Sequence, residues 1–129
     1  MNYIFLDAED IREIHEEAII NYGGIASERE SGMIEYMADK PFMESYGQEL
    51  YPGLFLKSAV YLEGFATHQY FNDGNKRTGV ACALTFLLIN GYQLLVDEME
   101  LYKIAIDVAN EIIHLHELSQ WLEENSSPL

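Results

Sequence analysis

The sequence has few of the features that mark secreted or membrane proteins. It contains a single cysteine, Cys82, so no disulfide framework can form within the chain. No apolar run reaches the roughly 18 residues that a membrane-spanning helix needs. The first residues lack a basic segment, so we expect no signal peptide. These absences predict a cytoplasmic protein with no membrane partner, in which Cys82 is a buried thiol.

Positive charge is also scarce. Seven lysines and arginines stand against 22 aspartates and glutamates, which gives a formal net charge of −15. Because such a surface repels phosphate backbones, the composition argues against a nucleic-acid partner and suits a partner with a basic face. Two of the seven cations, Lys76 and Arg77, are adjacent and directly follow a glycine and an asparagine. Their clustering predicts a local anion site in an acidic protein.

Apolar residues recur at helical spacing along most of the chain, which predicts one all-α domain over residues 1–129. The first expected helix is capped by Asp7 and ends at Gly23-Gly24, and a shorter second one is capped by Ser31 and stops before Pro41. The third has Pro52 in its first turn and ends near Thr67, and the fourth ends at Asn90-Gly91. The fifth is capped by Asp97 with Glu100, and the sixth runs from about His116 to Glu124. Residues 40–50 are expected to form an ordered surface loop. The fourth helix is apolar on almost all sides, which predicts a central, buried position.

The segment Asp73-Gly74-Asn75-Lys76-Arg77 carries the strongest chemical signal. Its simplest interpretation is a tight turn between two helices. However, the turn leads into the N-terminus of the fourth helix, where free backbone N–H groups and the positive end of the dipole meet. Gly74 permits close approach of a ligand, and the two cations stand where the helix dipole disfavours them unless an anion compensates. We therefore predict a phosphate site, with Asp73 as a candidate Mg²⁺ ligand.

Three other histidines carry weaker signals. His15 stands in the sequence His15-Glu16-Glu17, which lacks the second histidine of a zinc-binding helix, so a solvated helix face is expected there. His114 and His116 are two residues apart and would point to different sides of a helix. None of the three is assigned to a site.

The loop and its surroundings resemble the Fic/Doc family. The stretch from Phe71 to Gly79 is similar to the signature His-x-Phe-x-(Asp/Glu/Ala)-(Gly/Ala)-Asn-(Gly/Lys)-Arg from its phenylalanine onward, and its Asn-Lys-Arg ending resembles the death-on-curing (Doc) branch. Further stretches resemble Doc-type sequences in order and spacing: Ile14-His15-Glu16, Gly23-Gly24, Arg29 with Gly32, Tyr51-Pro52, and Phe86 to Gly91. The resemblance covers nearly the whole chain and implies a Fic-type helical bundle.

The resemblance also implies a transferase that uses ATP or another nucleoside triphosphate together with Mg²⁺. By position, Asp73 would hold the metal, and the phosphates would be contacted by Gly74, Asn75, Lys76 and Arg77. The lysine is associated with the kinase-like Doc toxins, which modify elongation factor Tu, arrest translation and are neutralised by an antitoxin. Val80 stands where the longer Fic signature has a second arginine, which favours phosphate transfer over AMP transfer.

The histidine of the signature is missing from its expected place. Counting back from Asp73 puts the catalytic base at Gln69, while His68 lies one residue earlier. On a helix, one residue displaces a side chain by about 100° and about 1.5 Å, which is enough to miss a reacting hydroxyl. Glutamine cannot take a proton at neutral pH. A regular helix with Gln69 facing the loop is the preferred arrangement.

Two hypotheses therefore stay open. The first is a Doc-like toxin in which His68 or Gln69, with Asp73, forms the catalytic group and a protein hydroxyl receives phosphate or AMP. The second is a catalytically degenerate Fic-fold module that keeps its phosphate loop and its protein-binding groove.

Overall fold

Six α-helices account for most of the computed structural model, which describes residues 2–129; Met1 lies outside the described part. The α-helices are α1 (Ala8–Tyr22), α2 (Met33–Asp39), α3 (Leu54–Thr67), α4 (Asn75–Ile89), α5 (Glu98–Ala109) and α6 (Leu115–Glu124). A short 3₁₀ helix, η1 (Lys40–Phe42), and four strands of two or three residues complete the chain: β1 (Glu44–Ser45), β2 (Gln48–Glu49), β3 (Tyr92–Leu94) and β4 (Ser126–Pro128). The all-α prediction is confirmed.

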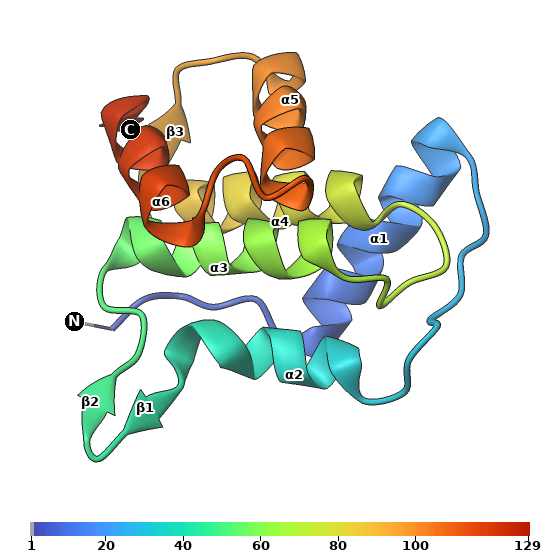
Figure 1. The fold of residues 1–129 in the computed structure, drawn as a ribbon, viewed down its shortest axis with the longest axis horizontal. Coiled ribbons are helices and arrows are strands. Elements are labelled where there is room, and N and C mark those ends of the chain that lie inside the picture. Colours follow the sequence, from blue (N-terminus) through green and yellow to red (C-terminus); the bar gives the residue numbers. More distant parts are fainter. Residues whose placement is uncertain (1) are drawn as a thin grey trace.

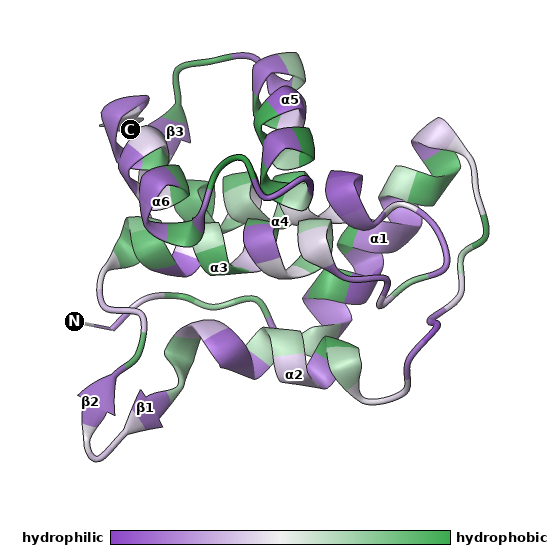
Figure 2. Ribbon diagram, viewed as in Figure 1, coloured by the Kyte–Doolittle hydropathy of each residue, from purple (hydrophilic) through white to green (hydrophobic). Residues whose placement is uncertain are grey.

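Helices α3 and α4 pack side by side at the centre, and the other helices cover them (Figure 1). Apolar residues gather on this pair, whereas the β1–β2 hairpin is hydrophilic (Figure 2). Helix α4 is central, as predicted, but α3 is more fully enclosed, because 11 of its 14 residues are buried against eight of the 15 in α4. None of the helices in residues 2–129 is both long enough and apolar enough to cross a membrane.

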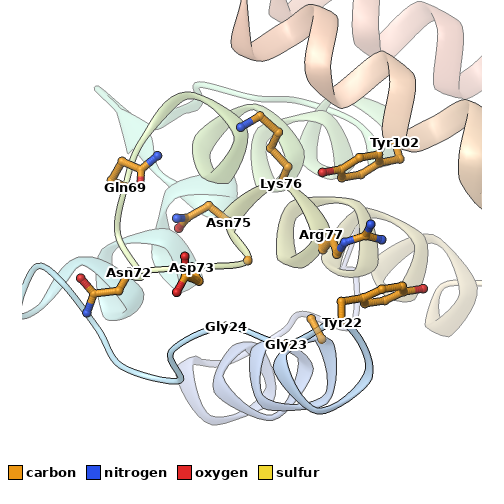
Figure 3. A pocket seen from close by; sticks show the side chains of 12 residues that line it. Tyr22, Gly23, Gly24, Gln69, Asn72, Asp73, Asn75, Lys76, Arg77 and Tyr102 are labelled. Atoms are coloured by element: carbon orange, nitrogen blue, oxygen red, sulfur yellow. The ribbon is translucent and has the colours of Figure 1, made fainter.

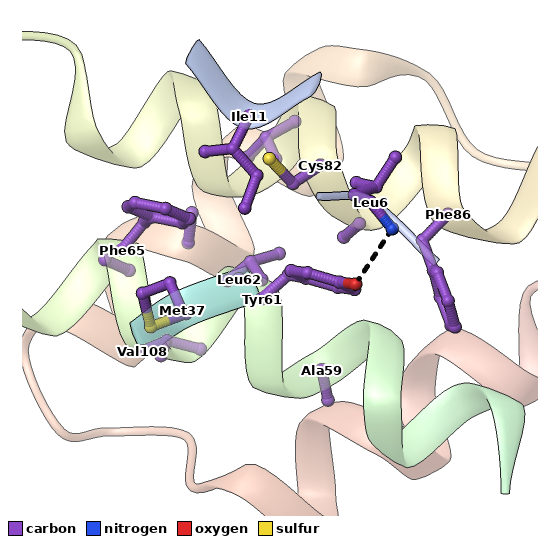
Figure 4. Packing of buried hydrophobic residues seen from close by; sticks show 14 of the residues in the cluster. Leu6, Ile11, Met37, Ala59, Tyr61, Leu62, Phe65, Cys82, Phe86 and Val108 are labelled. Atoms are coloured by element: carbon purple, nitrogen blue, oxygen red, sulfur yellow. Dashed lines mark hydrogen bonds between the residues drawn. The ribbon is translucent and has the colours of Figure 1, made fainter. Parts of the chain in front are cut away.

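The core joins residues from the N-terminal segment to α6 in one hydrophobic cluster. Figure 4 shows the part of this cluster around Tyr61. The phenol oxygen of Tyr61 in this cluster accepts a hydrogen bond from the backbone N–H of Leu6 at 3.4 Å. Cys82 is fully buried, as predicted, and burial raises the pKa of its thiol far above the ordinary value. Cys82 is therefore a packing residue with no reactive thiolate.

Two of the predicted helix starts are confirmed by their caps. The Asp7 carboxylate accepts from the backbone N–H of Asp10 in a capping box, and Asp97 accepts from the backbone N–H of Glu100. The prediction for Ser31 is wrong, because α2 begins after Gly32, which provides no side-chain cap.

Pro52 was expected in the first turn of the third helix, and this prediction is wrong as well. Helix α3 begins two residues later, at Leu54, and Gly53 is its N-cap. Pro52 instead lies in the segment that leads into the helix.

Residues 40–50, predicted as a surface loop, form η1 and the antiparallel β1–β2 hairpin. The buried ammonium of Lys57 explains why this segment has a defined structure. The Lys57 ammonium donates to the carbonyl oxygens of Pro41 (3.1 Å) and Tyr51 (2.6 Å) and to the Glu49 carboxylate (2.8 Å). These bonds fix both ends of the segment to α3, and the ammonium holds the pKa of Glu49 below its usual value.

Candidate functional site

The connection from α3 to α4 forms a loop whose last residue, Gly74, is the N-cap of α4. Gly74 has a left-handed backbone (φ 78°), and a Cβ there would lie 3.3 Å from the Cδ1 of Ile19. The glycine is thus needed for the turn and for packing against α1. Within residues 2–129 no side chain caps this helix, so the N–H groups of its first turn are free to bind an external acceptor.

A cavity of about 320 Å³ opens in front of this helix N-terminus. The residues that line it come from the loop, the first turn of α4, the end of α1 with the two glycines that follow it, and α5: Ala18, Tyr22, Gly23, Gly24, Gln69, Asn72, Asp73, Gly74, Asn75, Lys76, Arg77 and Tyr102 (Figure 3). The cavity therefore brings together every predicted site residue except His68. It also adds residues that were not predicted as site residues, above all Tyr22, Gly24 and Tyr102.

The Asp73 side chain is exposed and oriented by the segment that follows α1. Its Oδ2 atom accepts a hydrogen bond from the backbone N–H of Ile25 at 2.8 Å. Gly24 makes this approach possible, because a Cβ at Gly24 would lie only 2.8 Å from the Cβ of Asp73. The other carboxylate oxygen has no hydrogen-bond partner within residues 2–129, and the side chain lines the cavity.

This carboxylate fits Mg²⁺ better than a metal with an all-protein ligand set. Residues 2–129 contain no cluster of three or more His, Cys, Asp or Glu side chains that could hold a metal ion. Mg²⁺ commonly binds through one or two carboxylates, several waters and the phosphates of a substrate. Asp73 could supply the protein ligand of such a site.

The Asn75 side chain closes the loop. It is buried, its Oδ1 accepts from the backbone N–H of Phe71 (3.0 Å), and its Nδ2 donates to the Phe71 carbonyl (2.9 Å). Both ends of the amide are therefore engaged with the backbone. The group that Asn75 offers to a ligand is its own backbone N–H, in the first turn of α4.

Lys76 and Arg77 keep their charges unpaired. The ion pairs found in residues 2–129 involve only two other cations, Arg12 and Lys57. Two free cations beside an uncapped helix N-terminus, in a chain with a net charge of −15, create a strongly localised attraction for anions. The Arg77 guanidinium lies between two aromatic rings, at 3.7 Å from the ring centre of Tyr22 and 4.5 Å from that of Tyr102.

His15 packs against the loop through Phe71 and Asp73. The predicted solvated position is therefore wrong for this residue. It is 4% exposed, its ring stacks on Phe71 with 3.5 Å between centroids, and its Nε2 lies 2.7 Å from the carbonyl oxygen of Asp73. A carbonyl can only accept, so Nε2 carries the proton. The spacing of His15 from the buried residues Ile11 and Ala18 of α1 could have revealed it in the sequence.

A short extended segment after α1 runs antiparallel to the loop. The backbone N–H of Asn72 donates to the Ser27 carbonyl (3.0 Å), and the N–H of Arg29 donates to the Tyr70 carbonyl (2.8 Å). These bonds fix the edge of the loop that carries Asp73.

Arg12 anchors this segment to the helices behind it. Its guanidinium pairs with Glu28 (2.9 Å) and Glu35 (2.6 Å), and the hydrogen bond from Arg12 holds the pKa of Glu35 below its usual value. The segment is thereby tied to both α1 and α2.

His68 lies apart from the other predicted site residues. Helix α3 ends at Thr67, and His68 is its C-cap in an extended conformation. The ring stacks on Tyr70, and the Nδ1 lies 3.0 Å from the carbonyl of Gly64. His68 lines a separate cavity of about 310 Å³ together with Glu63, Thr67, Val108, Glu111, Ile113 and His114.

Gln69 lines the loop cavity, as expected, but the expected regular helix is wrong, because α3 ends at Thr67 and His68 is already extended. No histidine side chain lines that cavity in the part of the chain that the structure describes. The cavity therefore has the groups for binding an anion but no imidazole at its wall.

Sequence comparison with known proteins identifies the family of the chain. The model of the Fic/DOC family matches residues 5–87, which span α1 through most of α4 and include the loop. The chain is 39% identical over 93 residues to the protein named Toxin Doc of Mycolicibacterium smegmatis, covering 72% of this chain and 69% of that one. It is 31% identical over 117 residues to the Protein kinase doc of Escherichia phage P1, covering 91% of both. The chain belongs to the Fic/DOC family.

Proposed function

We propose that the chain is the toxin of a toxin–antitoxin pair and acts in the cytoplasm as a Doc-type transferase. Its substrates would be ATP or another nucleoside triphosphate with Mg²⁺, and a hydroxyl of a protein of translation such as elongation factor Tu. The observation that carries this proposal is the uncapped N-terminus of α4, which faces one cavity together with two unpaired cations. The names of the two relatives, a toxin and a protein kinase, support the same class of activity.

The residues of the cavity suggest how the nucleotide would be held. The N–H groups of the first turn of α4, with Lys76 and Arg77, would bind phosphate oxygens through charge-assisted hydrogen bonds. Asp73 would hold Mg²⁺, which would neutralise charge on the phosphates. Val80, at the position of the second arginine of the longer Fic signature, is buried and uncharged, which supports transfer of phosphate rather than AMP.

A second function is supported by a separate observation. Gln69 lines the cavity, whereas His68 lines another one. Loss of a general base lowers the rate of such reactions by about 10²–10⁴. The second candidate is therefore a degenerate member that binds nucleotide and a protein partner but transfers slowly.

The net charge of the chain suggests which kind of antitoxin segment it would bind. With a net charge of −15, the toxin would attract an antitoxin that carries a basic segment. Added salt should then slow their association, because exposed charges are screened.

A transfer assay separates the two candidates. The purified chain is incubated with Mg²⁺, elongation factor Tu and ATP labelled at either the α- or the γ-phosphate, and nucleotide binding is measured in parallel. Label from the γ-position on the target supports phosphate transfer, and label from the α-position supports AMP transfer. Binding without transfer supports the degenerate module, and absence of both contradicts either function.

A further inference from the structure

Two tyrosines from separate helices enclose the guanidinium of Arg77. Tyr22 is the last residue of α1, and Tyr102 lies in α5, so the two rings reach Arg77 from different parts of the fold (Figure 3). The ring centres are 3.7 Å and 4.5 Å from the guanidinium carbon, within the range of a cation–π contact. Stacking covers the faces of the planar group and leaves its N–H donors, which lie in the plane, uncovered.

A glutamate lines a neighbouring cavity together with Arg77 and forms no ion pair with it within residues 2–129. Glu98, in the first turn of α5, lines a small cavity of about 150 Å³ together with Arg77 and both tyrosines. An arginine and a glutamate whose side chains can meet commonly form a bidentate ion pair. No such pair is present within residues 2–129, where the ion pairs belong to Arg12 and Lys57.

We propose that Tyr22 and Tyr102 are positioning residues for Arg77. Their rings fix the plane of the guanidinium in the wall of the loop cavity and hold it away from Glu98. Without them, the side chain would turn to Glu98, and the ion pair would satisfy the donors that a phosphate group needs. The inference rests on the proposed function, because it requires a ligand with phosphate oxygens in the cavity.

The test measures binding of two probes, Mg²⁺–ATP and inorganic pyrophosphate, by calorimetric titration. Tyr102→Leu and Tyr22→Leu should each weaken binding roughly 3- to 30-fold, the range expected for loss of a cation–π contact. Tyr102→Phe and Tyr22→Phe keep the rings and should weaken binding far less. Because Tyr22 is 57% exposed, its substitution leaves the core intact, and the test stands even where Tyr102→Leu disturbs folding.

A suppressor separates positioning from a general packing effect. In the Tyr22→Leu background, which leaves the core intact, Glu98→Gln removes the competing carboxylate and should restore most of the lost affinity. Leucine variants that bind as well as the wild type, phenylalanine variants as weak as leucine variants, or failure of the suppressor would each overturn the inference. A wild-type chain that binds neither probe would instead overturn the proposed function itself.

Discussion

Two histidines flank the loop before α4, and each stacks on one of two consecutive aromatic residues. His15 stacks on Phe71 and is buried, with its Nε2 bonded to the carbonyl of Asp73. His68 stacks on Tyr70, is exposed, and bonds to the end of its own helix. The histidine next to the loop in sequence is thus turned away from the cavity, and the one that supports the loop is 58 residues from Asp73.

The cavities beside these two histidines also differ in the charged and titratable groups that line them. The loop cavity has Lys76, Arg77 and an uncapped helix N-terminus but no imidazole among the residues described by the structure. The cavity at the end of α3 has two histidines and two glutamates but neither lysine nor arginine in its lining. The cations that bind an anion and the imidazoles of His68 and His114 therefore lie in different cavities. This division predicts a protein that binds phosphate well and transfers it slowly.

The largest effect is expected from a comparison of His15→Ala with His68→Ala. Loss of the buried ring leaves a cavity against Phe71 and an unpaired carbonyl at Asp73, which should lower the free energy of unfolding by about 2–4 kcal/mol. Loss of the exposed His68 ring should lower the free energy of unfolding by less than about 1 kcal/mol. Urea unfolding of both variants measures the difference. Equal losses would remove the distinction between the two histidines.

A smaller effect is expected from Arg77→Ala. Loss of one charge-assisted contact should weaken Mg²⁺–ATP binding by about 10- to 100-fold. The melting temperature should fall only slightly, because Arg77 forms no ion pair within residues 2–129 and the substitution removes only its two cation–π contacts, each worth about 0.5–1 kcal/mol. Lys103→Ala removes an exposed cation that does not line the cavity and is the matched control. A large drop in melting temperature for Arg77→Ala would show that this residue is structural.

The smallest effect is expected from a pair of neighbouring glycines. Gly23 and Gly24 both have positive φ angles, but a Cβ at Gly23 would meet nothing within 4 Å, whereas one at Gly24 would meet Asp73. Gly24→Ala should therefore cost about 1–2 kcal/mol more than Gly23→Ala. It should also weaken Mg²⁺-dependent nucleotide binding, because Asp73 must move. Thermal unfolding and titration check both points, and identical behaviour of the two variants would contradict the described packing.

Local signals predicted much of the helical framework. Asp7 and Asp97 cap the helices for which they were proposed, and α4 begins and ends where the Asp73 to Arg77 turn and Asn90-Gly91 place its limits. The predictions failed where contacts between residues distant in sequence determine the local structure. Lys57 orders residues 40–51 through bonds to Pro41 and Tyr51, and no pattern within that segment indicates this.

The site residues, too, were predicted where they are neighbours in the sequence and missed where they are distant in it. The residues of the loop were found from their order in the sequence, because a glycine, two cations and a helix start are neighbours in the chain. His15, Tyr22, Gly24 and Tyr102 were missed, because only folding brings them to the loop. Two signals for His15 were present, its helical spacing and its place in a stretch that resembles Doc-type sequences, but its acidic neighbours favoured a solvated position.

The most direct test of a phosphate site without a base is a transfer assay on three chains: the wild type, His68→Ala and Gln69→His. A general base must lie within about 2.6–3.2 Å of the attacking hydroxyl, and of the two neighbouring positions only residue 69 lines the loop cavity. We predict slow transfer by the wild type, no change in His68→Ala, and a gain of about 10²-fold or more in Gln69→His. Loss of transfer in His68→Ala, with nucleotide binding intact, would contradict the division between the two cavities.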